Sequence, residues 1–335
     1  MTAPATALAP IFLVSLPRSG STLLQKVLAT TPEIATASEP WIALPVAYMT
    51  RRDGIATEYW QASAADALED VAAALPGGRD QLRAMQAGLV RATYAALAAG
   101  APDARYFLDK TPRYYLILDF LAEAFPDARF VFLFRHPLDV ASSILASWHK
   151  DTFTPHLRSN DIDLWHGPRM MADGFHRLAD RSVRVDYETL VADPGTAITE
   201  LARFLALDRL PADPVAAARD VEFTGRMGDP ARGRRYEGVA AHSVDRWRAS
   251  MRNPYRRAFF RSYVRSLDAA TLQAFGLDRE ALLQNLAQAP VSTSGLLRDI
   301  VGINWYRLSK SLHALHLEPG LRPLPRRDRQ RRQLG

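Results

Sequence analysis

Cysteine is absent from this chain of 335 residues, and lysine is scarce. Without cysteine the chain can form no disulfide, no thiolate metal site and no cysteine nucleophile. Only four of its 42 basic residues are lysines, namely Lys26, Lys110, Lys150 and Lys310. Arginine favours two-pronged contacts, whereas the compact ammonium of lysine can sit against a single transferring group. A lysine beside a candidate anion site is therefore a candidate for catalysis.

Long apolar runs are also missing. The apolar stretch at residues 7–16 is short, contains Pro10 and has no basic flank. These features fit neither a signal peptide nor a membrane-spanning helix. We expect a cytoplasmic protein, with contact to the inner face of a membrane as one alternative.

The positive charge is concentrated at one end of the chain. Residues 321–335, LRPLPRRDRQRRQLG, hold six arginines and one aspartate, a net charge of +5 out of the +6 of the whole chain. The other 320 residues therefore carry only +1. A basic tail of this kind is typically solvated, so we expect no nucleic-acid partner.

The hydrophobic pattern alternates between two periods. Buried strands are predicted at residues 11–15, 106–108, 129–134 and 183–187. Helical spacing follows at residues 20–30, 114–124 and 198–205, and also spans 55–100 with a break at Pro76-Gly77-Gly78. Strands that alternate with helices predict an α/β fold, a doubly wound and mainly parallel sheet flanked by helices. Residues 150–175 are predicted to be irregular because Pro155, Gly167 and Pro168 interrupt them.

We divide the chain into an α/β domain over residues 1–288, a helical C-terminal extension over 289–320 and the basic tail over 321–335. Within the domain, the helical segment at about 42–105 is expected to shape the acceptor site. The extension carries an apolar stripe interrupted by charges: Leu297, Ile300, Val301, Trp305, Leu308, Leu312 and Leu315. Such a stripe can pack on the domain, on a second copy in a homodimer, or on an anionic membrane surface.

The first chemical motif follows the first strand: Leu16, Pro17, Arg18, Ser19, Gly20, Ser21 and Thr22 form a short loop before a helix. Backbone N–H groups at such a helix start bind anions, and the hydroxyls and the arginine add donors and charge. The lysine that a nucleotide-hydrolysing P-loop carries after its last glycine is missing, because Ser21 stands there. A plain helix N-cap built from small residues is the alternative.

The second motif is FRHPLDVASSIL, residues 134–145, again a strand that leads into a helix. Arg135 lies at the carboxyl end of the strand, and Ser143 follows eight residues later. Both can meet a phosphate at the sheet edge where open α/β sheets bind ligands. A structural ion pair between Arg135 and Asp139 is equally compatible with this spacing.

Together the two motifs resemble the sulfotransferases that use 3′-phosphoadenosine 5′-phosphosulfate (PAPS), in particular the Golgi-type and protein-tyrosine enzymes and their bacterial relatives. The resemblance covers roughly residues 10–250 and implies a P-loop-like fold. It implies that the first loop holds the 5′-phosphosulfate and that Arg135 and Ser143 hold the 3′-phosphate. It also accounts for the missing lysine, since a donor without a magnesium-bound triphosphate does not need it.

Further matches imply roles for other residues. Glu39 in ASEPW lies where those enzymes keep a catalytic glutamate, and Lys110 in DKTPRYY lies where they keep a lysine near the transferring group. Arg18 would add positive charge beside them. Tyr187 in VDYETL matches the adenine region, and Arg234, Arg235 and Ser243 match a late segment that closes over the cofactor.

No metal is required by this chemistry, and the histidines fit no metal site. His149, His156, His166 and His176 fall within one stretch at spacings that suit no helical ligand pair. The histidine base that cytosolic small-molecule sulfotransferases carry after their lysine is replaced here by Thr111-Pro112-Arg113.

The sequence thus predicts a sulfotransferase that moves a sulfuryl group from PAPS to a hydroxyl acceptor, with Glu39 as general base. A carbohydrate, lipid-linked sugar or secondary metabolite is the expected acceptor. A peptide tyrosine is an alternative, which Arg51 and Arg52 would serve. A P-loop nucleotide or small-molecule kinase, or a non-catalytic nucleotide-binding protein, are alternatives of other classes.

Overall fold

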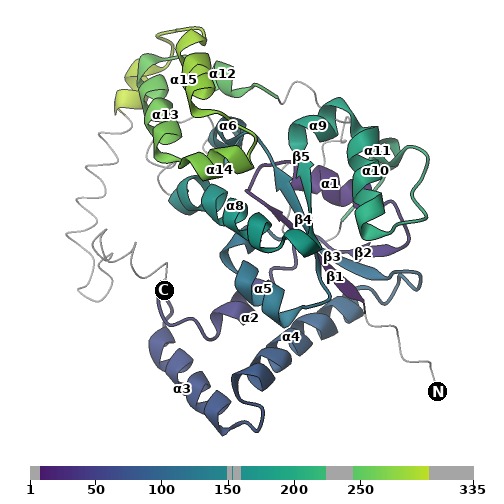
Figure 1. Ribbon diagram of the computed structural model, residues 1–335. Helices are drawn as coiled ribbons and strands as arrows, with labels where there is room; N and C mark the ends of the chain where they lie inside the picture. Colours follow the sequence, from purple (N-terminus) through teal and green to yellow (C-terminus); the bar gives the residue numbers. More distant parts are fainter. Residues whose placement is uncertain (1–7, 149–152, 154–159, 224–243, 302–335) are drawn as a thin grey trace.

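Five parallel strands form the central sheet of the computed structural model, which describes residues 8–148, 153, 160–223 and 244–301 (Figure 1). The spatial order is β2-β3-β1-β4-β5, with bounds Ala9–Ser15 (β1), Ile34–Thr36 (β2), Tyr106–Asp109 (β3), Arg129–Phe134 (β4) and Ser182–Asp186 (β5). Ile11 pairs with Leu108 of β3 on one side and with Arg129 of β4 on the other. The chain therefore crosses β1 when it passes from β3 to β4. In open α/β sheets, ligands bind beyond the carboxyl ends of the strands at such a switch point.

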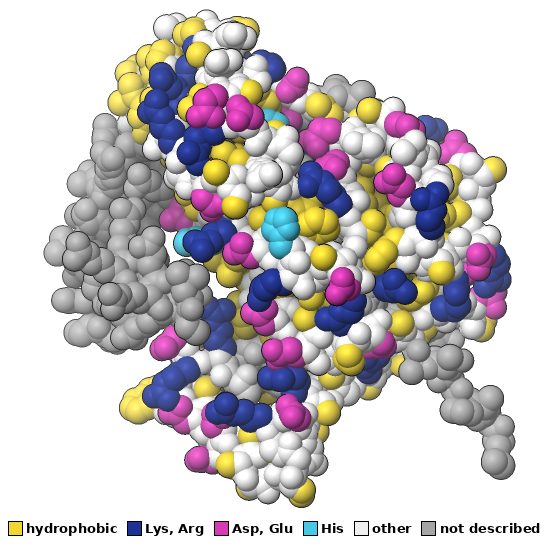
Figure 2. Space-filling model, in the orientation of Figure 1, with side chains coloured by type: hydrophobic (Ala, Val, Ile, Leu, Met, Phe, Trp, Pro, Cys, Tyr) yellow, Lys and Arg dark blue, Asp and Glu magenta, His cyan; other side chains and the backbone are white. Residues whose placement is uncertain are grey.

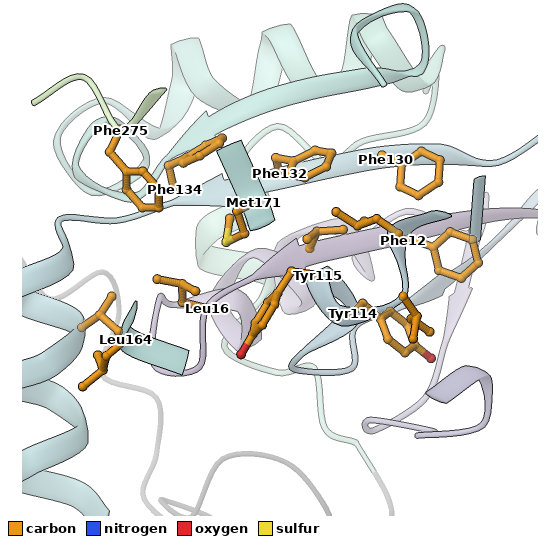
Figure 3. Close-up of a cluster of buried hydrophobic side chains, with 14 of the residues drawn as sticks. Phe12, Leu16, Tyr114, Tyr115, Phe130, Phe132, Phe134, Leu164, Met171 and Phe275 are labelled. Carbon is orange, nitrogen blue, oxygen red and sulfur yellow. The ribbon is translucent and has the colours of Figure 1, made fainter. Parts of the chain in front are cut away.

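The strands are buried on both faces because side chains alternate between two cores. Phe12 and Val14 of β1 join an aromatic-rich core that includes Phe130, Phe132 and Phe134 of β4 (Figure 3). The intervening residues of the same strands enter an aliphatic core on the opposite face, namely Ile11, Leu13, Val131 and Leu133. Each strand residue is thus committed to one face, which fixes the register of the sheet.

Helices cover both faces (Figure 1). The aliphatic core is closed by α1 (Ser21–Leu28), α9 (Tyr187–Ala192), α10 (Pro194–Leu205) and the turn that follows α11 (Pro214–Ala217). The aromatic core receives side chains from α2 (Ala43–Tyr48), α4 (Gly78–Leu97), α5 (Leu118–Ala124), α6 (Pro137–Trp148), α8 (Gly167–Arg177), α12 (Trp247–Ser250), α13 (Pro254–Ser266), α14 (Ala269–Ala274) and α15 (Arg279–Gln288). Helix α3 (Gln61–Ala74) and the adjoining end of α4 project away from the sheet. Short helical segments are η1 (Tyr114–Leu116), η2 (Ile162–His166) and η3 (Ala179–Arg181).

The predicted fold class is confirmed, and the strand predicted at 129–134 matches β4 residue for residue. The prediction that residues 150–175 are irregular is wrong for residues 162–175, because a π-helical turn, η2, leads directly into α8. Most of residues 150–159 fall outside the described residues. Gly167 and Pro168 begin α8 rather than break it. Proline is tolerated in the first turn of a helix, where its missing N–H has no intrahelical partner to lose.

The C-terminal helices are tied together by a buried ion pair. The guanidinium Nε of Arg256 donates to Asp299 Oδ2 at 2.7 Å, and Asn253 Nδ2 donates to the same oxygen at 2.6 Å. The residues between α15 and position 301 are thereby anchored to α13. Most of the predicted apolar stripe and the basic tail lie at residues 302–335, outside the described residues. Membrane or homodimer contact through them stays a prediction.

Two further observations concern the surface charge and the character of the helices. On the face shown in Figure 2, basic and acidic side chains are interspersed over most of the surface. Among the described residues, no helix combines the length and the apolar character needed to cross a membrane.

Candidate active site

The first predicted loop lies beyond the carboxyl end of β1, the strand next to the switch point. Two of its residues adopt left-handed backbone conformations, Arg18 with φ of 66° and Gly20 with φ of 91°. The carbonyl of Gly20 accepts from the N–H groups of Leu23 and Leu24 and so starts α1. The Ser19 side chain is buried, and its Oγ has no hydrogen-bond partner within the described structure. Buried hydroxyls are nearly always paired, so this one suits a site for an anion.

The second predicted motif meets the first loop in space. Arg135 Nη1 donates to the carbonyl oxygen of Arg18 at 2.8 Å, and Arg18 Nε lies 3.5 Å from Ser143 Oγ on α6. The Arg135 guanidinium also stacks on the ring of Tyr187, with its central carbon 4.2 Å from the ring centroid. Four residues predicted from three motifs thus share one edge of the sheet.

The hydrogen bonds of Asp139 bear on the alternative that Arg135 and Asp139 form a structural ion pair. Its two carboxylate oxygens accept from the backbone N–H groups of Asp245 and Trp247, at 3.0 and 3.1 Å. Burial raises the pKa of Asp139, and the Trp247 hydrogen bond and the charge of Arg135 act in the opposite direction. The direct partners of Asp139 are thus backbone groups, and Arg135 acts on it as a neighbouring charge.

His136 and Glu188 support the start of α6. His136 Nδ1 accepts from the N–H of Leu138, and the N–H of His136 donates to Glu188 Oε1 at 3.0 Å. The imidazole stacks on Trp247, with ring planes 5° apart. Burial lowers the pKa of His136 to about 4, so this ring is neutral near pH 7. It supports the loop as a neutral acceptor.

Pairing of β2 with β3 brings the other two predicted catalytic residues together. Thr36 pairs with Leu108, and because the strands are parallel the chain leaves both at the same edge. Beyond this edge Lys110 Nζ lies 2.6 Å from Glu39 Oε1 and 3.5 Å from Thr22 Oγ1 of the first loop. The side chain of Lys110 is only 2% exposed and that of Glu39 10%. A buried ammonium needs such a partner, because an unpaired charge there is strongly unfavourable.

Several residues around this pair were not predicted from the sequence. Trp41 contacts Glu39 through its indole N–H and Thr111 through its backbone N–H. Asp109 is fully buried, and its carboxylate accepts hydrogen bonds from the hydroxyls of Thr111, Tyr94 and Tyr114. Burial raises the pKa of Asp109, while these three hydrogen bonds and the charge of Lys110 act in the opposite direction. The one sequence signal for this cluster is that Asp109 and Thr111 flank Lys110.

Arg234, Arg235 and Ser243 fall outside the described residues, as do His149 and His156. His166 and His176 lie in η2 and α8. Within the described ranges, no group of His, Asp or Glu side chains is arranged to hold a metal ion.

Comparison with known proteins places this chain in a family. The profile of the Sulfotransferase family matches residues 10–211, which include the sheet, both loops and the Glu39–Lys110 pair. The chain belongs to the Sulfotransferase family.

Individual relatives are more distant. The nodulation protein NoeE of Sinorhizobium fredii (strain NBRC 101917 / NGR234) is 34% identical over 137 residues, which cover 41% of this chain and 31% of NoeE. The match thus spans about a third of that relative. The sulfotransferase domain from the curacin biosynthetic pathway superposes with a TM-score of 0.53 at 20% identity, covering 80% of this chain and 96% of that chain. The sulfotransferase domain of the Synechococcus PCC 7002 olefin synthase has a TM-score of 0.48 at 23% identity, covering 82% and 96%.

Proposed function

We propose that this protein transfers a sulfuryl group from PAPS to the hydroxyl of a carbohydrate, a lipid-linked sugar or a secondary metabolite. The observation that carries the proposal is the contact between Glu39 and Lys110, 2.6 Å long, beside the first loop. It joins a candidate base and a candidate cation at the place where the loop offers hydroxyl and N–H donors. Membership of the Sulfotransferase family supports sulfuryl transfer as the type of reaction.

The residues of the two loops fit the donor. The phosphosulfate end would lie on the first loop. There the Ser19 hydroxyl, which has no partner among the described residues, and the N-terminus of α1 would supply donors. Gly20 leaves room for the ring of Tyr187, which packs against the loop. Arg135 and Ser143 would hold the 3′-phosphate, and the ring of Tyr187 would border the adenine. PAPS, when bound, supplies a sulfuryl group already attached to a good phosphate leaving group.

The side chains then have distinct tasks. Glu39 accepts the proton of the acceptor hydroxyl as the acceptor oxygen forms its bond to sulfur. Transfer would break the bond from sulfur to the bridging phosphate oxygen and would leave the electron pair on that oxygen. Lys110, Arg18 and the loop N–H groups stabilise this developing negative charge without having to reorganise. As in phosphoryl transfer, positioning and electrostatics do most of the work.

The arginines that would serve an acidic peptide already have partners in the fold. Arg51 stacks on Tyr48 and donates to the carbonyl of Asp53, while Arg52 pairs with Asp66. These contacts favour a small hydroxyl acceptor over a peptide tyrosine.

The test is calorimetric titration with 3′,5′-adenosine bisphosphate (PAP), the product nucleotide, in EDTA. We expect micromolar binding to the wild type, lost in Arg135→Ala and kept in Arg79→Ala, at an exposed residue in the first turn of α4. Radiolabelled PAPS is then offered with para-nitrophenol, methyl glucoside and dodecyl glucoside as acceptors. No PAP binding alongside binding of magnesium–ATP would overturn the proposal in favour of a kinase. PAP binding without transfer to any acceptor or to water would favour a nucleotide-binding protein.

A further inference from the structure

We propose that Trp41 is a positioning residue for the Glu39 carboxylate and that Thr111, backed by Asp109, holds Trp41 in place. The inference rests on the proposed function, in which Glu39 is the general base. It assigns a role to a chain of hydrogen bonds that runs from the protein interior to the reacting edge of the sheet.

The first link fixes both oxygens of Glu39. The indole Nε1–H of Trp41 donates to Oε2 at 3.2 Å, while Lys110 donates to Oε1 at 2.6 Å. Two donors on different oxygens leave the carboxylate little freedom to rotate. The backbone of Glu39 is restricted as well, because Pro40 follows it and disfavours helical conformations at the preceding residue.

The second link holds Trp41 itself. Its backbone has φ of 55°, a left-handed conformation that a bulky residue adopts only when its surroundings impose it. The backbone N–H donates to Thr111 Oγ1 at 3.2 Å, and the partly buried indole packs against the aromatic-rich core. Trp41 is therefore held at both its backbone and its ring.

The third link determines which group donates and which accepts along this series of hydrogen bonds. Thr111 Oγ1 donates its single proton to Asp109 Oδ1 at 2.8 Å, so its lone pairs remain for the N–H of Trp41. Asp109 Oδ2 accepts from the hydroxyls of Tyr94 on α4 and Tyr114 in η1, each at 2.6 Å. The carboxylate that orients Thr111 is thus itself fixed from two other elements.

Two adjacent residues at the end of β3 thereby determine both contacts of the Glu39 carboxylate. Lys110 and Thr111 are neighbours beyond β3, and one binds Glu39 directly while the other binds it through Trp41. A general base acts efficiently only when its oxygen lies within hydrogen-bond reach of the proton it removes. Small displacements of such a group cost large factors in rate, so a loosened Trp41 should slow transfer while donor binding persists.

The experiment compares variants with saturating PAPS and whichever panel acceptor the wild type sulfates fastest. Trp41→Phe keeps the ring and removes the N–H. We expect kcat to fall by about tenfold, with the PAP dissociation constant and the acceptor KM changed by less than about threefold. Trp60→Phe, at a tryptophan 82% exposed, is the matched control and should behave like the wild type.

Thr111 is tested by a pair of substitutions. Thr111→Val removes the hydroxyl and should lower kcat by about as much as Trp41→Phe, and Thr111→Ser should recover most of that loss. If Thr111 acts through Trp41, the double variant should be no slower than Trp41→Phe alone, because the two changes break one chain of contacts. Should Thr111→Val fail to fold in thermal melts, Trp41→Phe and Thr111→Ser decide.

The outcomes separate this inference from the function on which it rests. Equal kcat in Trp41→Phe and Trp60→Phe, with Glu39→Gln inactive, overturns the positioning role and leaves the proposed function standing. Additive losses in the double variant, or a weakened PAP affinity in Trp41→Phe, would show a general structural role instead. Full transfer by Glu39→Gln would overturn both.

Discussion

The ring of Tyr187 fills the space that a side chain at residue 20 would need. A Cβ added to Gly20 would lie 2.3 Å from Tyr187 Cε2, and the backbone of Gly20 has φ of 91°. The start of α9 is thereby packed directly onto the first loop, with Arg135 stacked on the same ring. Glycine is required here for two independent reasons, its backbone conformation and the closeness of the tyrosine.

Gly20→Ala should therefore damage the loop. We expect PAP affinity to fall by at least about tenfold and the free energy of unfolding to drop by about 1–3 kcal/mol, from strain and overpacking. Calorimetry and denaturant melts measure the two effects. Gly88→Ala is the control, since its added Cβ would meet nothing within 4 Å on the exposed face of α4. That change should stabilise the helix by about 0.5–1 kcal/mol. Wild-type PAP binding by Gly20→Ala would show that the loop tolerates a different shape.

Glu39→Gln tests the proposed base directly. The amide keeps the size of the side chain but cannot accept the acceptor proton as a carboxylate does, so transfer should fall by at least about a hundredfold. PAP affinity should stay close to that of the wild type. The exposed Glu69→Gln serves as the control. Loss of PAP binding in Glu39→Gln would assign the residue a structural role.

His136 should make stability depend on pH. Its folded pKa of about 4 lies below the value of 6.5 for an unperturbed histidine, because burial disfavours the charged ring. Asp245 opposes this shift, while Arg135 and Arg248 add to it. The unfolded chain therefore binds the proton first as pH falls. The stabilisation is fully present above about pH 6.5 and declines towards about pH 4, by up to about 3 kcal/mol.

The variant His136→Asn isolates this effect, because the amide oxygen can accept the Leu138 N–H as Nδ1 does. Denaturant melts at pH 7 and pH 5 should show the wild type losing about 2 kcal/mol more than the variant. His176→Asn, at an exposed histidine, should follow the wild type. Parallel losses in wild type and His136→Asn would contradict the assignment.

The buried pair of Arg256 and Asp299 should matter for stability. Their side chains are 3% and 0% exposed, so removal of the carboxylate takes away the counter-charge that Asp299 gives to a buried guanidinium. Asp299→Ala should lower the free energy of unfolding by about 3–5 kcal/mol in denaturant melts. Removing an arginine from the exposed pair Arg79–Glu69 should cost less than about 1 kcal/mol. If both changes cost the same, the segment before residue 301 does not depend on this anchor.

Much of the fold was predictable because its signals are local. Strands β1 and β4 are uninterrupted apolar runs followed by turn residues, and both were predicted. Strand β2 was missed because Ile34–Thr36 is too short to show a period, and only its pairing with β3 makes it a strand. The segment around Gly167 and Pro168 was predicted incorrectly. Glycine and proline break a helix when they lie in its interior, but both are found where a helix begins.

The site residues that could be predicted are likewise those whose signals are local in the sequence. The first loop is one contiguous stretch between a strand and a helix, so its character as an anion site could be predicted from sequence. Glu39 and Lys110 were predicted through a family resemblance, but the distance between them was not. Trp41 and Thr111 were not predicted because neither belongs to a recognisable local pattern. Their proposed role depends on a contact between residues that are 70 positions apart in the sequence.

The amino-acid sequence by itself determined the candidate anion loop and the order of the helices and of every strand except β2, because each depends on neighbours along the chain. The candidate base and cation came from a family resemblance. Only the tertiary structure decided that these groups lie together. The parallel pairing of β2 with β3 delivers residues 37–41 and 109–111 to one edge, and β1 between β3 and β4 sets the first loop beside Arg135. Strand neighbours are selected by burial of both sheet faces, a property of the whole packed chain rather than of any segment within it.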